Sequence, residues 1–454
     1  MKTKHPFFAS VCALAVPAAL QSMLQASFSI VDQIMIGQLG SVSVAGVGLA
    51  GKFASVFSVV VSAVGAVAGI MMSQYFGQRN TREVKRSFWV NLSLSLAVAA
   101  VFTLLCALFP ARVMRLYTTD PATELAAAEY LAIIAWTFFP TAGATLLSTL
   151  FRCAEKPKLP LYAGIVSALM NTGINYVLIF GKCGFVPMGA RGAAIATVIA
   201  QCANVLIMLV LLPQCRKALA GGSVAFVQGE TRFNWGQYLG MLLPVLVCEV
   251  MWSVGENVYA AIYGHMGTLS SAAMTLINPV QGLVIGALCG LSQAASVLVG
   301  KRLGKGEYDR AYAEAKRLIL YGAVGAAMLS VVVAAMSGLY VEIYQVEASV
   351  KLLTRRLLYA YALIEPFKVL NMILGGGIIR SGGKTKYVMV IDMIGTWLIG
   401  VPVGYVSAFV LGLEIPYVYY LLSLEEVVRF VISVFVFRKR TWMQSLEAPG
   451  APVV

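Results

Sequence analysis

The sequence predicts an all-α integral membrane protein with twelve transmembrane helices in two pseudo-symmetric six-helix bundles. Three observations support this: an apolar composition, the number of long apolar segments, and a long internal repeat. Of the 454 residues, 59% are hydrophobic and 12% are charged, whereas soluble domains carry roughly 25% charged residues. A chain with so few charges is expected to reside in a lipid bilayer.

About twelve apolar segments are long enough to cross a bilayer, which takes roughly 20 residues. They cover residues 10–36, 44–76, 87–109, 122–151, 159–181, 190–213, 236–263, 269–300, 317–339, 348–379, 386–412 and 415–437. The longest of these helices must tilt, bend or extend beyond the lipid.

The two halves of the chain share landmarks at a constant distance. Pro17 precedes the segment Gly37-Gln38-Leu39-Gly40, and 227 residues later Pro244 precedes Gly264-His265-Met266-Gly267 in the same way. Arg152 and Lys158 recur as Arg380 and Lys386 after 228 residues. Paired repeats of membrane helices are typical of transporters.

These landmarks define the expected domain organisation. We expect an N-terminal six-helix lobe (1–213), a cytoplasmic linker (214–234), a C-terminal six-helix lobe (235–440) and a C-terminal tail (441–454). The linker is the longest polar connector and contains glycine and charged residues. No segment is long enough for the soluble domain that an ATPase or kinase would need, so the sequence does not predict an enzyme.

Basic residues are distributed unevenly between alternate loops. Of the 34 Lys and Arg, 24 fall in loops on one side, seven in loops on the other, and three within spans. Because positive residues stay in the cytoplasm during insertion, we expect both termini in the cytoplasm. The protein itself is expected in a cell (plasma or inner) membrane. This distribution also explains the net charge of +14 without a nucleic-acid partner.

Cofactor and disulfide chemistry is not indicated. The eight cysteines are mostly scattered through apolar segments, and no CxxC pair occurs, which predicts buried small side chains rather than disulfides. Two histidines are too few for a histidine-built metal site. The first apolar run lacks a clear cleavage site and is too long for a signal-peptide core, so we interpret it as the first helix.

Two glycine-rich segments resemble nucleotide motifs without the context that these motifs need. Residues 46–51 match GxGxxG but lie between membrane helices, where small residues are better explained by close helix packing. Residues 377–385 (GIIRSGGKT) have the first glycine one position too far from the Gly-Lys-Thr of a phosphate loop, and we expect a cytoplasmic turn.

Ionisable residues within spans are the candidate functional groups, because a charge there costs at least about 2.5–3.5 kcal/mol. Asp32 and Glu249 have no opposite charge nearby in sequence, which favours a functional role. Glu365 and Lys368 share one helical face, and a structural pair and a transport role are both open for them. Lys52 lies early in its span and could extend its ammonium group to the membrane surface. A structural role is favoured for the remaining charged residues within spans: Glu256, Asp392, Glu425, Glu426 and Arg429.

Asn171 and Asn175 are four residues apart in the fifth span and therefore share a face. Two amides can complete a site around a carboxylate without adding charge. The same pair could equally join two helices by hydrogen bonds.

Several segments together resemble the multidrug and toxic compound extrusion (MATE) transporters, over about residues 10–440. SIVDQIMIGQLG (29–40) resembles the first-helix signature of that family, and SQYFGQRNTREVKR (73–86) and VGKRLGKGEYDRA (299–311) resemble its repeated loop. The segment FRCAEKPKLPLYAGIVSALMNTGINYVLIFG (151–181) is the most specific, and GARGAAIATVIAQ (189–201) resembles the start of the sixth helix.

The resemblance implies export of cationic or amphiphilic drugs and toxic organic compounds in exchange for H⁺ or Na⁺, by alternating access between two lobes. It places the coupling-cation site at Asp32, Asn171, Asn175 and Thr197. Na⁺ at Asp32 is the only metal implied. Asn175 stands where some members carry an aspartate, so this site has one carboxylate fewer. The resemblance therefore does not decide whether the coupling ion is H⁺ or Na⁺.

A second candidate cavity follows for the C-terminal lobe. Glu249 and Glu365 lie on the two helices that carry carboxylates in some family members, about one turn from those positions, and Lys368 accompanies them. If Asp32, Glu249 and Glu365 face a cavity with Lys52 and Lys368, that cavity is net acidic and should prefer lipophilic cations.

The expected partners are the lipid bilayer and small-molecule substrates, with the protein as a monomer. One alternative is a flippase or exporter of lipid-linked or polysaccharide substrates from the same superfamily. Twelve spans and an excess of acids over bases at membrane depth argue against it. The other alternative is a signalling or scaffold membrane protein, which the repeat and the buried acids argue against.

Overall fold

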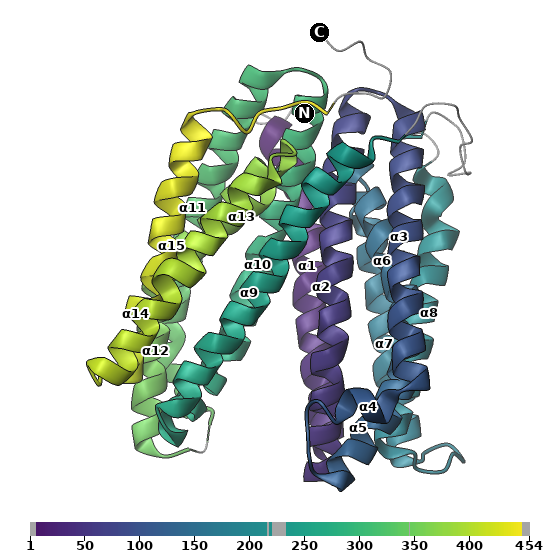
Figure 1. Ribbon diagram of the computed structural model, residues 1–454, viewed down its shortest axis with the longest axis vertical. Coiled ribbons are helices and arrows are strands. Elements are labelled where there is room, and N and C mark those ends of the chain that lie inside the picture. The colour runs from purple at the N-terminus through teal and green to yellow at the C-terminus, as the bar shows by residue number, and fades with distance from the viewer. Residues whose placement is uncertain (1–5, 216–217, 220–232, 345, 447–454) are drawn as a thin grey trace. The chain divides into compact units, whose positions relative to one another are not determined.

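The computed structural model describes residues 6–215, 218–219, 233–344 and 346–446, and these residues form helices without a single strand (Figure 1). This confirms the predicted all-α fold. Most of the expected linker 214–234 and the end of the expected tail 441–454 lie outside these ranges.

In the first half, long helices alternate with short connecting ones. The elements are α1 (Pro6–Gly37), α2 (Ser41–Gly77), α3 (Thr81–Leu108), α4 (Pro110–Met114), α5 (Pro121–Ile134), η1 (Ala135–Thr137), α6 (Phe138–Cys153), α7 (Lys158–Phe180), α8 (Gly189–Leu211) and η2 (Leu212–Cys215). The predicted fourth span corresponds to α5, η1 and α6 together, because a short 3₁₀ segment interrupts it.

The second half contains wider, π-helical turns that the sequence did not predict. Its elements are α9 (Trp235–His265), α10 (Thr268–Gly304), α11 (Tyr308–Glu342), α12 (Ala348–Asn371), η3 (Met372–Ile379), α13 (Thr385–Met393), η4 (Ile394–Gly400), α14 (Val401–Tyr405), η5 (Val406–Val410) and α15 (Ile415–Arg438). Hydrophobic spacing does not distinguish an occasional π turn from an α-helix.

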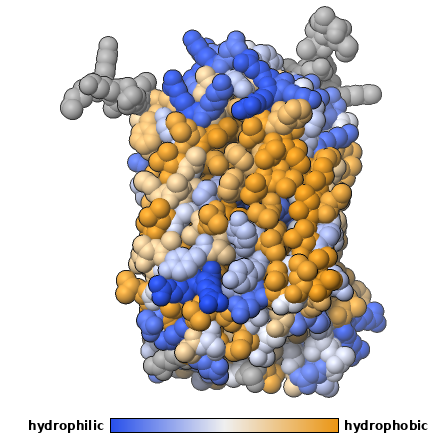
Figure 2. Space-filling model, turned by 90° about the vertical axis from the view of Figure 1, so that its left-hand side faces the viewer, coloured by the Kyte–Doolittle hydropathy of each residue, from blue (hydrophilic) through white to orange (hydrophobic). Residues whose placement is uncertain are grey.

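Eleven helical segments in the described residues are long and apolar enough to cross a membrane. The twelfth predicted span is α15, which has 24 residues but carries Glu425, Glu426 and Arg429 near its middle. The fold is that of a multi-pass membrane protein with two six-helix bundles. On the face seen in Figure 2, apolar side chains cover most of the middle, and hydrophilic residues gather at the top and again toward the bottom.

The repeat is visible in the backbone as well as in the sequence. Pro17 lies inside α1 and Pro244 inside α9. The helices α2 and α10 have 37 residues each and follow Gly40 and Gly267, whose φ angles are 92° and 106°. Only glycine adopts such angles readily, so the Gly-X-X-Gly landmark at both places is explained by the turn it forms.

Contacts divide the chain into two compact units, Leu20–Glu230 and a second unit made of Met1–Ala19 with Thr231–Val454. The first part of α1 therefore packs within the C-terminal unit. There, a side chain at Gly290 of α10 would collide with the backbone of Ala15 and Ala19. The lobe boundaries predicted from the sequence stay a prediction.

Each unit has its own apolar core. In the N-terminal unit, α2 packs on α3, α5 and α6, and α7 packs on α8. In the C-terminal unit, α10, α11, α12 and α15 pack on one another in sequence, and α13 lies against α9 (Figure 1). Phe57 and Phe138 stack at 4.3 Å in the first core, and Trp442, which is fully buried, stacks on Phe437 in the second.

The two glycine motifs differ in what the structure shows. Gly46 lies against Ala127 of α5, where an added Cβ would be 2.9 Å from the backbone nitrogen, which agrees with close helix packing. Gly48 and Gly51 have no such neighbour among the described residues. The predicted turn after the tenth span is present, with Gly383 at a φ of 74°.

Candidate functional site

The four residues predicted for the N-terminal site come together in the N-terminal unit. Asp32 lies on α1, Asn171 and Asn175 on α7, and Thr197 on α8. The Asn175 amide donates to Asp32 Oδ1 at 2.7 Å, and the Asn171 and Thr197 side chains are 3.3 Å apart. The Asn171 amide is best assigned with its nitrogen toward Asp32, at 2.9 and 3.0 Å from the two carboxylate oxygens.

Close packing of α7 and α8 brings the amides and the threonine together. Gly192 of α8 lies so near Leu178 that an added Cβ would be 2.9 Å from its backbone oxygen. On the same helix pair, the Ser167 hydroxyl donates to the Ala200 carbonyl at 2.7 Å. The site thus lies at a close contact between two helices that are consecutive in the chain.

The oxygen atoms of this site are of the kinds that coordinate small cations. Asn171 and Asn175 are 7% and 1% exposed, and Asn175 Oδ1 has no hydrogen-bond partner in the described residues. Asp32 forms no ion pair with a described residue and is only partly buried. A carboxylate, a free amide oxygen and a hydroxyl form a donor set for Na⁺, and the carboxylate alone can take a proton.

Tyr130 of α5 is a fifth residue of this neighbourhood that sequence reasoning missed. It is 9% exposed and interacts electrostatically with Asp32. Its position among ordinary apolar residues of the predicted fourth span gives no sequence signal.

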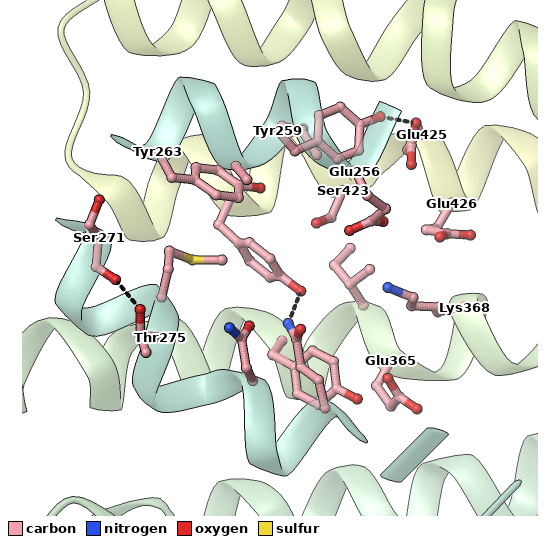
Figure 3. Close-up of a pocket in the computed structure, with 18 residues that line it drawn as sticks. Glu256, Tyr259, Tyr263, Ser271, Thr275, Glu365, Lys368, Ser423, Glu425 and Glu426 are labelled. Carbon is pink, nitrogen blue, oxygen red and sulfur yellow. Dashed lines mark hydrogen bonds between the residues drawn. The ribbon is translucent and has the colours of Figure 1, made fainter. Parts of the chain in front are cut away.

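The C-terminal unit contains a cavity of about 350 Å³ that includes Glu365 and Lys368 (Figure 3). Further acidic residues on its walls are Glu256 of α9 and Glu425 and Glu426 of α15. Tyrosines and amides complete the lining: Tyr259, Tyr263, Tyr361, Tyr419, Asn278 and Gln281.

A neighbouring cavity of about 390 Å³ contains Glu249 and shares Lys368 and Glu426 with the first. The predicted trio of the C-terminal lobe is therefore divided between two cavities. Glu249 is not an isolated charge, because Arg380 pairs with it at 2.9 Å. Arg380 belongs to the segment 377–385, for which a turn was expected. It follows η3 directly, and its side chain contacts Glu249 of α9.

A compact charge cluster around Arg429 contains three of the acids for which the sequence favoured a structural role. Arg429 is 3.4 Å from Glu425, 3.7 Å from Glu426 and 3.9 Å from Asp392, and its guanidinium also bonds to Thr396. This confirms the internal pairing expected from the spacing in α15.

Two glycines of η4 make room for this cluster. A side chain at Gly395 would collide with Arg429, and one at Gly400 would collide with Tyr259 and Glu425. The Tyr259 hydroxyl donates to Glu425 at 2.5 Å. The buried charges of α15 are thus compensated by neighbours on α9, α13 and η4.

The fold and these sites define a class: a multi-pass membrane transporter with ionisable groups on the membrane helices of both halves. The sequence profile of the MatE family matches residues 17–177 and 244–406. The chain belongs to this family, the MATE transporters. The two matched segments begin 227 residues apart, as the internal repeat does.

Relatives match nearly the whole chain. The uncharacterised transporter YisQ of Bacillus subtilis is 23% identical over 96% of this chain and 95% of its own length. The probable multidrug resistance protein NorM of Rhodopseudomonas palustris is 27% identical over 87% and 84%.

Solved structures show the same fold. The MATE transporter VcmN of Vibrio cholerae has a TM-score of 0.86 at 16% identity, covering 96% of this chain and 98% of that one. A MOP superfamily transporter of Pyrococcus furiosus, described as having a binding pocket of reversed polarity, has a TM-score of 0.82 at 16% identity, with 95% of both chains covered.

Proposed function

We propose that this protein exports cationic or amphiphilic organic compounds in exchange for H⁺ or Na⁺. The observation that carries the proposal is the arrangement at Asp32, whose carboxylate is bonded by amides and has no cationic partner among the described residues. The family supports small-molecule transport, and the charge and identity of the substrate belong to the proposal.

The physical basis of coupling is the cost of an empty site. An ionised carboxylate in a low dielectric is unfavourable unless water, a proton or Na⁺ compensates it. Ion binding can therefore stabilise one arrangement of the protein and substrate binding another. Exchange requires only that each ligand has different affinities for the two states.

The proposed orientation has both termini in the cytoplasm of a cell (plasma or inner) membrane, with a monomer as the transporting form. Cys183, an exposed residue between α7 and α8, offers a native reporter. With the other cysteines replaced, we expect an impermeant maleimide to label Cys183 in intact cells. Lys156→Cys, in the turn before α7, should be labelled only after the membrane is opened, and the reverse pattern would contradict the orientation.

Substrate charge separates the proposal from the alternative of a flippase for lipid-linked or polysaccharide substrates. The cavity of about 350 Å³ has four carboxylates and one lysine on its walls, so it should favour cations. In proteoliposomes with an ion gradient, we expect a cationic dye to be transported faster than neutral or anionic dyes of similar size. Preference for the anionic dye would favour the flippase.

A further inference from the structure

Glu365 and Lys368 line one cavity, three residues apart on α12, and yet do not pair with each other. Neither oxygen of Glu365 accepts a hydrogen bond in the described residues, although the side chain is fully buried. Lys368 has no ion pair within 4 Å in the same ranges, and Figure 3 shows the two side chains leaving α12 in different directions.

The other buried acids of this cavity already have partners. Glu425 is bonded by Tyr259 at 2.5 Å and paired with Arg429 at 3.4 Å. Glu426 accepts from Asn371 at 2.8 Å and lies 3.7 Å from Arg429. The acidic and basic side chains of this cavity that have no ion pair within 4 Å in the described residues are the buried Glu365, Lys368 and the more exposed Glu256.

The walls suit an aromatic ligand of modest size. Tyr263 and Tyr419 have ring centroids 6.4 Å apart, and Gln281 holds the Tyr419 hydroxyl at 2.9 Å. The Tyr361 hydroxyl, next to Glu365, has no hydrogen bond of ordinary geometry among the described residues. A volume of about 350 Å³ is at the lower end for small-molecule pockets.

We propose that this cavity binds an amphoteric aromatic compound, with Glu365 taking its ammonium group and Lys368 its carboxylate. Such a ligand compensates both unmatched charges at once. A simple cation would compensate Glu365, as the acidic walls favour, but would leave Lys368 without a partner. The inference rests on the proposed export function and names the substrate class for its C-terminal cavity.

Three probes with one aromatic body test the proposal: L-tryptophan, its methyl ester with only the ammonium, and N-acetyl-L-tryptophan with only the carboxylate. Binding to the purified full chain in lipid nanodiscs is measured by calorimetry. We expect tryptophan to bind at least about tenfold more tightly than either analogue, since each lost pair is charge-assisted.

Three variants test which side chain binds which charged group of the ligand. Lys368→Met should weaken tryptophan binding and leave the methyl ester unchanged, whereas Lys368→Arg should keep the preference for tryptophan. Glu365→Gln should weaken tryptophan and leave N-acetyltryptophan unchanged. If a variant fails to fold, the comparison of the three probes on the unmodified protein still decides.

Equal binding of tryptophan and its ester, or no binding of any probe, would overturn the inference. So would a Lys368→Met variant that weakens both ammonium probes equally. These outcomes leave ion-driven export of a cationic dye untouched, whereas loss of that export in the unmodified protein would overturn the proposed function itself.

Discussion

Asp32→Asn should fold and reach the membrane but lose ion-driven export. The substitution preserves size and hydrogen bonding to Asn175 while it removes the only charge of the N-terminal site. Typical coupling free energies of about 1–3 kcal/mol correspond to roughly 5–150-fold. We therefore expect an ion gradient to stimulate dye efflux by a factor in that range in the unmodified protein, and not to stimulate it in Asp32→Asn. Efflux from proteoliposomes with and without the gradient measures it.

Matched variants separate this effect from a general loss of charge. Asp309→Asn removes the same group from a surface position, where the side chain is 93% exposed, and should leave efflux unchanged. Asn171→Ala and Asn175→Ala keep the carboxylate and should weaken coupling less than Asp32→Asn does. Full gradient dependence in Asp32→Asn at normal expression would show that coupling occurs elsewhere.

Arg429→Leu should cause the largest loss of stability among single substitutions in α15. Arg429 is 6% exposed and compensates Glu425, Glu426 and Asp392. Removing one partner of a buried ion cluster costs about 3–5 kcal/mol, because the remaining charges are left buried and unpaired. The fraction of monodisperse protein after heating, followed by size-exclusion chromatography, provides the measurement.

An exposed pair serves as the control for Arg429. Arg191 contacts Glu129 at 2.5 Å with a side chain that is 58% exposed, and such pairs contribute about 0–1 kcal/mol. Arg191→Leu should therefore change the melting temperature little. Adding Glu425→Gln to Arg429→Leu should restore part of the loss, and a stability of Arg429→Leu equal to that of Arg191→Leu would contradict the assigned role.

Local spacing accounts for the parts of the structure that the sequence predicted well. The repeated prolines and Gly-X-X-Gly turns fixed the correspondence of α1 with α9 and of α2 with α10. The three-residue and four-residue separations within α15 predicted the Arg429 pairs. In each case the relevant partners lie on one helix or recur at one interval.

The features that the sequence did not predict depend on contacts between residues far apart in the chain. Arg380 and Glu249 are 131 positions apart, and nothing local in the sequence links them. Glycines 395 and 400 look like ordinary helix-packing residues, although their role is to admit the side chains of α15 and α9. The resemblance to a family indicated Asp32 and Asn175 as neighbours, which their separation of 143 positions could not.

The central claim is that ion and substrate movements are obligatorily linked through Asp32. Reciprocity of coupling means that a substrate gradient must drive the ion as well. In proteoliposomes loaded with a cationic dye and free of any ion gradient, dye efflux should drive H⁺ or Na⁺ inward, reported by an internal pH or Na⁺ indicator, and this signal should vanish in Asp32→Asn. Dye efflux without ion movement, or an unchanged ion signal in the variant, would contradict the claim.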